Sequence, residues 1–260
     1  MDIPLFSIIN WTRKFINWNE MKRIPYIINQ FRSPIKVVVY GESGVGKTQF
    51  VNTITMSHEY AKSRTRDISR GHILKLSNGR RVELIDIPGQ SSYIQKRASL
   101  VNLYKKGEIK GVINIVAYGY LAKPETRENE AFKIGTDIIK PKFLRDNLKL
   151  ELKQTKEWIE LVSNNKNVEW VMHIINKADL WYDKEQAVTE YYELHDYRRD
   201  VIDPLSPKRR WKLLHYCSTM TSFLKHHLPH AIDEEMKEML HKNLMKELEE
   251  LALRSNNGKT

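Results

Sequence analysis

The chain has 260 residues and one cysteine, Cys217, which excludes an internal disulfide framework and a cysteine-rich metal site. Its formal net charge of +11 favours anionic partners such as nucleic acid, a ribosome or an acidic membrane, although a lysine-rich soluble surface explains the charge equally well. No signal-peptide pattern and no apolar run of roughly 20 residues is present. We therefore expect a cytoplasmic protein, with peripheral attachment to a membrane left open.

Residues 1–34 form an apolar, aromatic and basic lead-in, which predicts one or two short amphipathic helices interrupted at Pro25. This N-terminal extension either packs on the rest of the protein or lies on a membrane or a protein partner. Directly after it, residues 36–40 read KVVVY and are β-branched and apolar, as in a buried parallel strand.

A glycine-rich turn follows this strand and precedes a predicted helix at 49–55. It matches the pattern G-x-x-x-x-G-K-[ST] in full. Glycines let successive N–H groups converge on phosphate oxygens, and the helix N-terminus adds a partial positive charge. Lys47 is expected to reach the outer phosphates and Thr48 to give a hydroxyl ligand to Mg²⁺. The predicted nucleotide contacts here are Gly41, Glu42, Ser43, Gly44, Val45, Gly46, Lys47 and Thr48.

Two alternating stretches, 72–76 and 81–87, flank the sequence Ser-Asn-Gly at 77–79. Asn-Gly between alternating stretches is the strongest short signal for a β-hairpin, so we expect an antiparallel pair of strands.

The second of these strands ends in the sequence Asp-Ile-Pro-Gly at 86–89. A carboxylate at Asp86 could hold the hydration shell of Mg²⁺, and Gly89 could present its N–H to the γ-phosphate. Gln90 could orient a water molecule for attack on that phosphate. Thr65, in the basic loop before the hairpin, is predicted to ligate Mg²⁺ only while the γ-phosphate is present, and Ser69 is the alternative.

The second half of the chain continues the alternation of strands and helices. Strands are predicted at 111–118, 170–175 and 213–217, and helices at 95–105, 148–162, 186–194 and 233–253. Two further stretches, 121–147 and 180–210, are rich in charged residues. A cluster of histidines, His226, His227 and His230, is interpreted as a surface helix end, and residues 231–260 as a C-terminal helix and tail. Strands alternating with helices predict a layered α/β fold whose sheet is mostly parallel.

Asn-Lys-Ala-Asp at 176–179 follows the strand 170–175 and predicts the choice of base. The Asp179 carboxylate can accept two hydrogen bonds from the N1 and N2 hydrogens of guanine, both of which adenine lacks. Asn176 can tie this loop to the phosphate loop, and the alkyl part of Lys177 can cover one face of the ring. Ser218, after the last strand, could offer a main-chain N–H to guanine O6.

These motifs, in this order, resemble the Ras-like, translation-factor-related class of P-loop GTPases, with further similarity to Era- and TrmE-like bacterial GTPases. The resemblance covers about residues 35–225. Compared with a minimal G domain, the stretches 121–147 and 180–210 read as insertions that could set a protein partner. It implies a three-layer G domain at 35–230, with a six-stranded sheet, one antiparallel edge strand and helical N- and C-terminal extensions. It also implies GTP and GDP as substrate and product, Mg²⁺ as cofactor, and slow hydrolysis. An alternative is a nucleotide-dependent scaffold that binds GTP with negligible hydrolysis.

Overall fold

A computed structural model describes residues 33–55, 71–87, 108–123, 126–205, 209–220, 223–224, 226 and 228–255. The predicted N-terminal helices, the predicted helix at 95–105 and four candidate site residues lie outside these ranges. The four residues are Thr65, Ser69, Gly89 and Gln90.

Six strands form one sheet in the order β2-β3-β1-β4-β5-β6. Only the β2–β3 pair is antiparallel, and it places β2 at the edge, as the Ser77–Gly79 turn predicts. The turn closes through the bond from Gly79 N to Leu76 O at 3.0 Å. The strands are β1 (Ile35–Tyr40), β2 (His72–Lys75), β3 (Arg81–Asp86), β4 (Ile109–Val116), β5 (Trp170–Ile175) and β6 (Arg210–His215).

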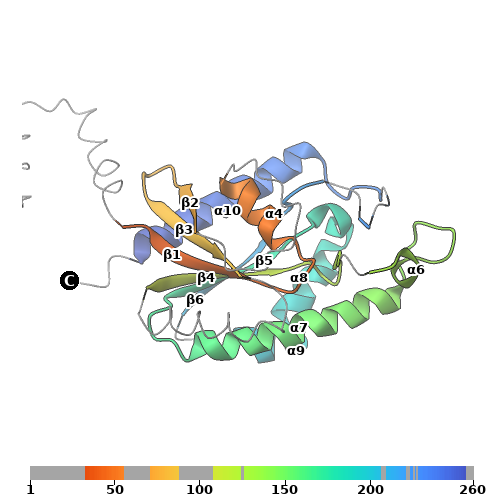
Figure 1. Cartoon of the computed structure of the whole chain (residues 1–260), viewed down its shortest axis with the longest axis horizontal. Coiled ribbons are helices and arrows are strands. Elements are labelled where there is room, and N and C mark those ends of the chain that lie inside the picture. Colours follow the sequence, from red (N-terminus) through yellow and green to blue (C-terminus); the bar gives the residue numbers. More distant parts are fainter. Residues whose placement is uncertain are drawn as a thin grey trace, which may run out of the picture.

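Helices cover both faces of the sheet, so the molecule has three layers (Figure 1). The strand β1 shows why: Val37 and Val39 belong to one apolar cluster, whereas Val38 and Tyr40 belong to the other. Both faces of this strand are buried, which explains its unbroken β-branched sequence.

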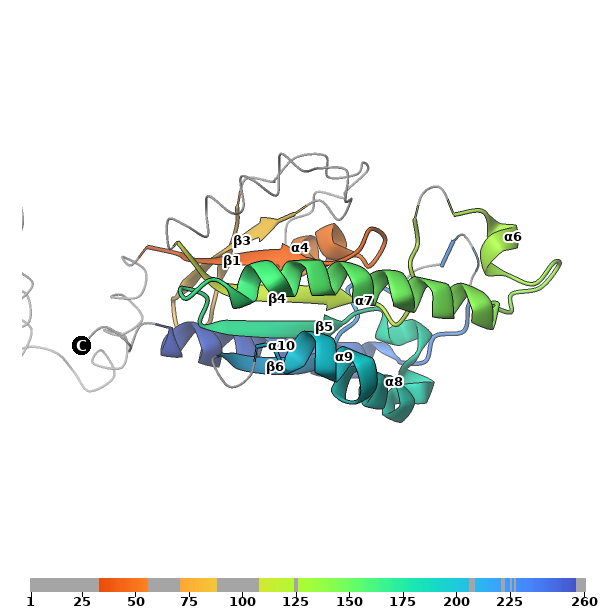
Figure 2. The same ribbon diagram turned by 90° about the horizontal axis from the view of Figure 1, so that it is seen from below.

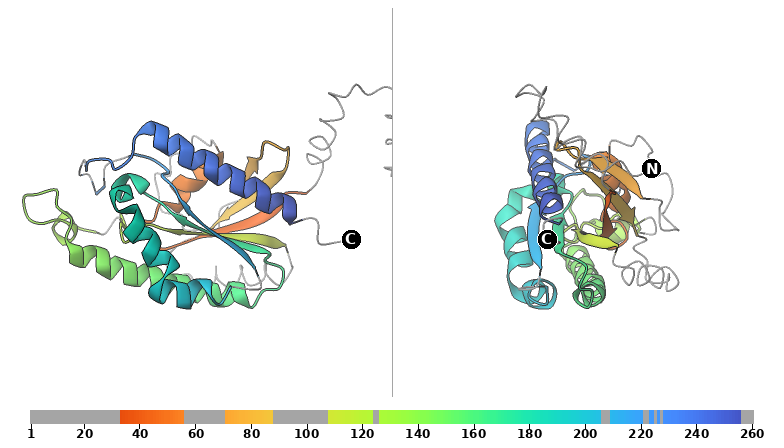
Figure 3. Two further views of the ribbon diagram at one scale, coloured as in Figure 1. Left: turned by 180° about the vertical axis from the view of Figure 1, so that it is seen from behind. Right: turned by 90° about the vertical axis from the view of Figure 1, so that its left-hand side faces the viewer.

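One apolar cluster is capped by α4 (Lys47–Thr55) and α10 (Glu234–Arg254), and the other mainly by α7 (Pro141–Ser163) and α8 (Glu185–Glu193). Figure 3 shows α10 and α7 on opposite sides of the sheet. Asp233 caps α10 by accepting a bond from Met236 N at 2.8 Å. The shorter helices are α6 (Glu128–Ala131), η1 (Ala178–Leu180), η2 (Tyr182–Lys184), α9 (His195–Tyr197) and the π-helix η3 (Arg198–Ile202).

The helix α7 begins seven residues earlier than the prediction of 148–162, inside the stretch read as an insertion. Pro141 occupies its first turn, where a missing N–H costs nothing. Its buried stripe starts with the polar residues Asn147, Glu151 and Thr155, so apolar periodicity could not reveal the first two turns. Figure 2 shows α6 standing out beyond the N-terminal end of α7.

Two strand boundaries were also predicted wrongly. The strand β4 ends at Val116 rather than residue 118, because the N–H groups of Ala117 and Gly119 turn to the Glu151 carboxylate at 2.7 and 3.2 Å. The strand β6 spans 210–215 rather than 213–217. Cys217 and Ser218 leave the strand because they bond to side chains that follow β5. No helix in the described part of the chain is both long and apolar enough to cross a membrane.

Candidate nucleotide-binding site

The candidate residues come together at the edge of the sheet where the parallel strands end. The phosphate loop follows β1, Asp86 ends β3, and the segments 176–179 and 217–219 follow β5 and β6. The strands β1 and β4 are neighbours, and the chain leaves β1 towards β2 and β3 but leaves β4 towards β5, so the two connections diverge at this point. Such a switch in strand order is where open α/β sheets bind ligands.

The phosphate loop folds around the side chain of Lys47. The Lys47 ammonium donates to the carbonyls of Gly41 at 2.9 Å and Glu42 at 3.0 Å. Burial lowers the pKa of Lys47, and the nearby Asp86 carboxylate partly offsets that effect. The loop therefore holds a desolvated cation among main-chain carbonyls, which a phosphate oxygen could replace as its partner.

Gly46 is held against the loop that follows β5. Its φ of +92° lies in the region that favours glycine, and a Cβ atom here would meet Asn176 Nδ2 at 2.8 Å. A side chain at position 46 would therefore both strain the backbone and push Asn176 away.

The segment after β4 supports the phosphate loop from a third direction, which the sequence did not reveal. Ala122 N donates to Gly44 O at 3.3 Å, and the Lys123 ammonium lies 3.2 Å from the Glu42 carboxylate. A cavity of about 620 Å³, lined by residues including Lys123, Arg127 and Leu224, opens beside these contacts. The predicted insertion thus begins in direct contact with the phosphate loop.

Thr48 and Asp86 form the candidate metal site. Thr48 Oγ1 donates to Asp86 Oδ2 at 2.8 Å. The other carboxylate oxygen, Oδ1, is buried and has no hydrogen-bond partner among the described residues. Burial raises the pKa of Asp86, and Lys47 acts in the opposite direction.

This donor set fits Mg²⁺. A hydroxyl and one carboxylate are hard oxygen donors, and Mg²⁺ sites commonly use one or two carboxylates, with waters and substrate phosphates completing the shell. The described residues contain no group of three or more His, Cys, Asp or Glu side chains that could hold a metal, so a dedicated all-protein cage is not present among them.

Asn176 ties three segments together, and the predicted tie to the phosphate loop is present. Asn176 Nδ2 donates to Val45 O at 2.9 Å, and its Oδ1 accepts from Ser218 N at 3.1 Å and from Ser218 Oγ at 3.0 Å. Ser218 therefore lies at the site, but its N–H is directed to Asn176. These bonds satisfy the buried amide oxygen of Asn176, which needs donors.

Lys177 spans the gap between the loops that follow β1 and β4. Its ammonium donates to Gly44 O at 2.8 Å and to Tyr120 O at 2.5 Å. Burial lowers its pKa to about 8. The side chain thus fixes the phosphate loop to the turn at 117–120. The sequence analysis predicted only that Lys177 packs on the base and did not predict this contact.

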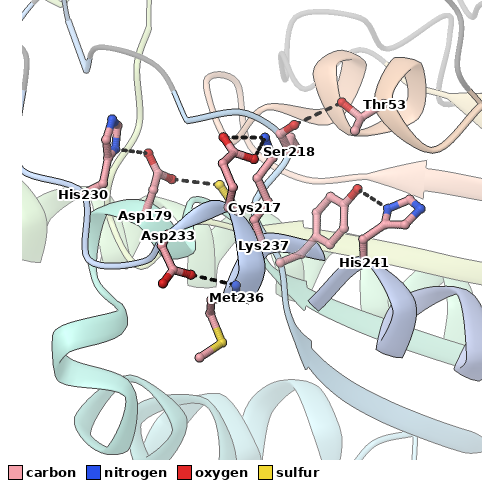
Figure 4. A network of polar contacts seen from close by, with 11 residues as sticks. Thr53, Asp179, Cys217, Ser218, His230, Asp233, Met236, Lys237 and His241 are labelled. Atoms are coloured by element: carbon pink, nitrogen blue, oxygen red, sulfur yellow. Dashed lines mark hydrogen bonds and ion pairs between the residues drawn. The ribbon is translucent and has the colours of Figure 1, made fainter. Parts of the chain in front are cut away.

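Asp179 is enclosed from two sides, as Figure 4 shows. Cys217 Sγ donates to Asp179 Oδ1 at 3.3 Å, and His230 Nδ1 lies 3.6 Å from Asp179 Oδ2. Burial is also the main reason that the pKa of Asp179 is raised. Neither neighbour was predicted: Cys217 was placed only at the end of the predicted strand 213–217, and His230 was interpreted as part of a surface helix end. Adjacency to Ser218 was the one signal that pointed to Cys217.

The fold and this cluster of residues define a P-loop nucleotide-binding G domain. A family model described as "50S ribosome-binding GTPase" matches residues 36–177, more than half of the chain. The chain belongs to this GTPase family, which binds GTP and GDP.

Two other comparisons add little. No curated protein matches the chain by sequence. Among solved structures, that of the mammalian SRP receptor is 15% identical, with a TM-score of 0.45, over 80% of this chain and 98% of the matched chain. A likeness at that level carries no conclusion about this protein.

Proposed function

We propose that this protein hydrolyses GTP to GDP and phosphate with a bound Mg²⁺ ion and works as a molecular switch. The observation that carries the proposal is the contact between the three predicted elements. The phosphate loop touches Asp86 through Thr48 and touches the base-selecting loop through Asn176. These three elements are far apart in the sequence but lie at one edge of the sheet. Each of them is suited to one portion of GTP.

The phosphate end of the nucleotide would be held by the loop and by Lys47. Its ammonium would exchange the carbonyls of Gly41 and Glu42 for oxygens of the outer phosphates. Thr48 Oγ1 and Asp86 would hold Mg²⁺, directly or through its waters. The ion would neutralise charge on the phosphate oxygens.

Three residues outside the described part of the chain complete the proposed switch. Thr65 would join Mg²⁺ while the γ-phosphate is present, Gly89 would donate its N–H to that phosphate, and Gln90 would orient the attacking water. Water then displaces GDP from the γ-phosphorus, so the bond to the β–γ bridging oxygen breaks as the bond to water forms.

The base would be selected by Asp179. Its two carboxylate oxygens would accept the N1 and N2 hydrogens of guanine, and Asn176 would keep the loop in register with the phosphate loop. Adenine offers neither hydrogen and would leave the buried carboxylate without the two donors that guanine supplies.

A single-turnover assay of purified full-length protein tests the proposal. We expect phosphate release from GTP but not from ATP at equal concentration, and a slower rate in Gln90→Ala. Binding of GTP with no release of phosphate in either protein would favour the scaffold alternative. Failure to bind GDP or GTP with Mg²⁺ present would contradict both.

We also propose that a protein partner docks on the stretch 121–147. Ile134 and Ile138 lie between α6 and α7 in the chain and are 92% and 55% exposed. Figure 1 shows α6 at one end of the molecule. Because the same stretch contacts the phosphate loop through Ala122 and Lys123, a change at the nucleotide could reach this surface. The amount of protein that copurifies with the GTP-loaded and the GDP-loaded forms, measured for the wild type and for Ile134→Asp, tests whether a partner docks on this stretch.

A further inference from the structure

The carboxylate of Asp179 cannot receive a purine in the arrangement that the structure shows. Its side chain is only 3% exposed. Oδ1 is taken by the thiol of Cys217, and Oδ2 faces His230 (Figure 4). Guanine needs a lone pair on each oxygen. Oδ1 keeps a second lone pair beside the one that the thiol uses, but the 3% exposure of the side chain leaves no room for the base, so one of these two neighbours has to move before it can bind.

Cys217 is the less movable of the two neighbours. It is buried and follows directly on the main chain of Tyr216, whose N–H still bonds to Ile175 O at 2.9 Å. Its neighbour Ser218 is held by Asn176. The thiol therefore belongs to the framework of the site.

His230 is free to leave. Its side chain is 39% exposed and lies in the irregular segment 228–233 that precedes α10. The contact with Asp179 Oδ2, at 3.6 Å, is longer than a hydrogen bond. The main chain beside it is anchored, because Ala231 N donates to Asp179 O at 2.7 Å. The imidazole can thus swing outward while the segment stays in place.

We propose that His230 occupies the base-recognition acid in the nucleotide-free protein and that guanine displaces it. The imidazole lies 3.6 Å from the same oxygen that the base requires, so the two compete for the space beside Asp179 Oδ2. His230 therefore slows nucleotide entry and does not contact the bound base. This inference rests on the proposed role of Asp179 in guanine recognition.

The charged groups around this contact favour the competition. Asp179 is affected by Lys177 on its own loop and by His230 from the segment before α10, and Lys237 on α10 acts on the neighbouring Cys217. The His230 imidazole lies 3.6 Å from Oδ2. Withdrawal of His230 leaves the buried carboxylate in need of a donor, which the edge of guanine supplies.

The test is the kinetics of GDP binding to the full chain with His230→Ala, followed by stopped flow with a fluorescent GDP analogue. We expect association about 2- to 5-fold faster than in the wild type and unchanged dissociation, as fits the small free energy of a partly exposed ion pair. His226→Ala is the matched control. This histidine of the same connection pairs with Asp137 at 2.6 Å, away from Asp179, and both rates should stay at wild-type values.

Other outcomes overturn the inference. Faster dissociation in His230→Ala would mean that the imidazole helps to hold the bound base, and unchanged association would mean that it does not cover the acid. Neither result touches the proposed function, which fails only if wild-type protein does not bind GDP or GTP.

Discussion

The side-chain amide of Asn176 joins two parts of the chain that are 131 residues apart, because it donates to the main-chain carbonyl of Val45 at 2.9 Å. Its oxygen accepts two bonds from Ser218 on the other side. The side chain is 1% exposed, so water cannot replace these partners. The phosphate loop, the loop 176–179 and the segment after β6 are therefore positioned by one amide.

Replacing this amide should weaken both the fold and nucleotide binding. In Asn176→Ala the carbonyl of Val45 and the N–H of Ser218 lose a buried partner, so we expect a loss of about 2–4 kcal/mol in the free energy of unfolding. The affinity for GDP should fall by more than the fraction of unfolded protein explains, since the three loops lose the side chain that positions them relative to one another. Urea unfolding and calorimetry measure the two effects. Asn243→Ala, on the exposed face of α10, should leave both near wild type.

Removal of Lys47 should abolish nucleotide binding without lowering the stability of the nucleotide-free protein. Lys47→Ala deletes a buried ammonium whose pKa is lowered by desolvation, so the nucleotide-free protein should unfold at the same or a higher temperature. Binding of GTP and GDP should be abolished, because the outer phosphates lose their cation. Calorimetry with nucleotide and thermal unfolding without it provide the two readings. Wild-type affinity in this variant would show that the ammonium does not reach the phosphates.

Metal dependence should reside in Asp86. The unpartnered Oδ1 of Asp86 predicts that Asp86→Asn reduces the tightening of GTP binding by Mg²⁺ at least about tenfold. Binding in the presence of a chelator should change less. Titrations of wild type and variant with GTP, in Mg²⁺ and in EDTA, give the ratio of the two dissociation constants for each protein. An equal loss under both conditions would contradict a metal role and indicate damage to the loop.

Glu151 should make stability fall as the pH rises. It is buried beneath the turn after β4, where it accepts bonds from Ala117 N, Gly119 N and Tyr192 OH. Burial raises its pKa to about 7, although those bonds act in the opposite direction. Between about pH 4 and 7 the folded state holds a proton that the unfolded state has released, so stability from this group decreases across that window.

The variant Glu151→Gln isolates this effect. Its stability should vary less with pH, so the wild type should lose up to about 3 kcal/mol relative to it between pH 4.5 and pH 7.5. Urea unfolding at several pH values measures the difference, and the titration of other groups cancels because both proteins contain them. A difference that stays constant with pH would mean that the pKa of Glu151 is the same in the folded and the unfolded state.

Local signals in the sequence predicted most of the fold. The β-branched run before the phosphate loop, the Asn-Gly turn and the leucine stripe of α10 each act over a few residues, where neighbouring side chains decide the structure. The predictions failed where polar groups lie in the interior. The start of α7 carries Asn147 and Glu151 on its buried face, and the ends of β4 and β6 are set by side-chain acceptors on other elements.

The sequence by itself determined the order of the motifs and predicted the chemistry of the site. Each motif is a short run in which residue type and spacing together indicate a role, as they do for the glycines, Lys47, Asp86 and Asp179. Tertiary structure decided which groups meet: Lys177 with Tyr120 O, Cys217 and His230 with Asp179, and Lys123 with Glu42. The physical reason is that these contacts join loops that follow different strands. Only the side-by-side pairing of parallel strands brings those loops to one edge of the sheet.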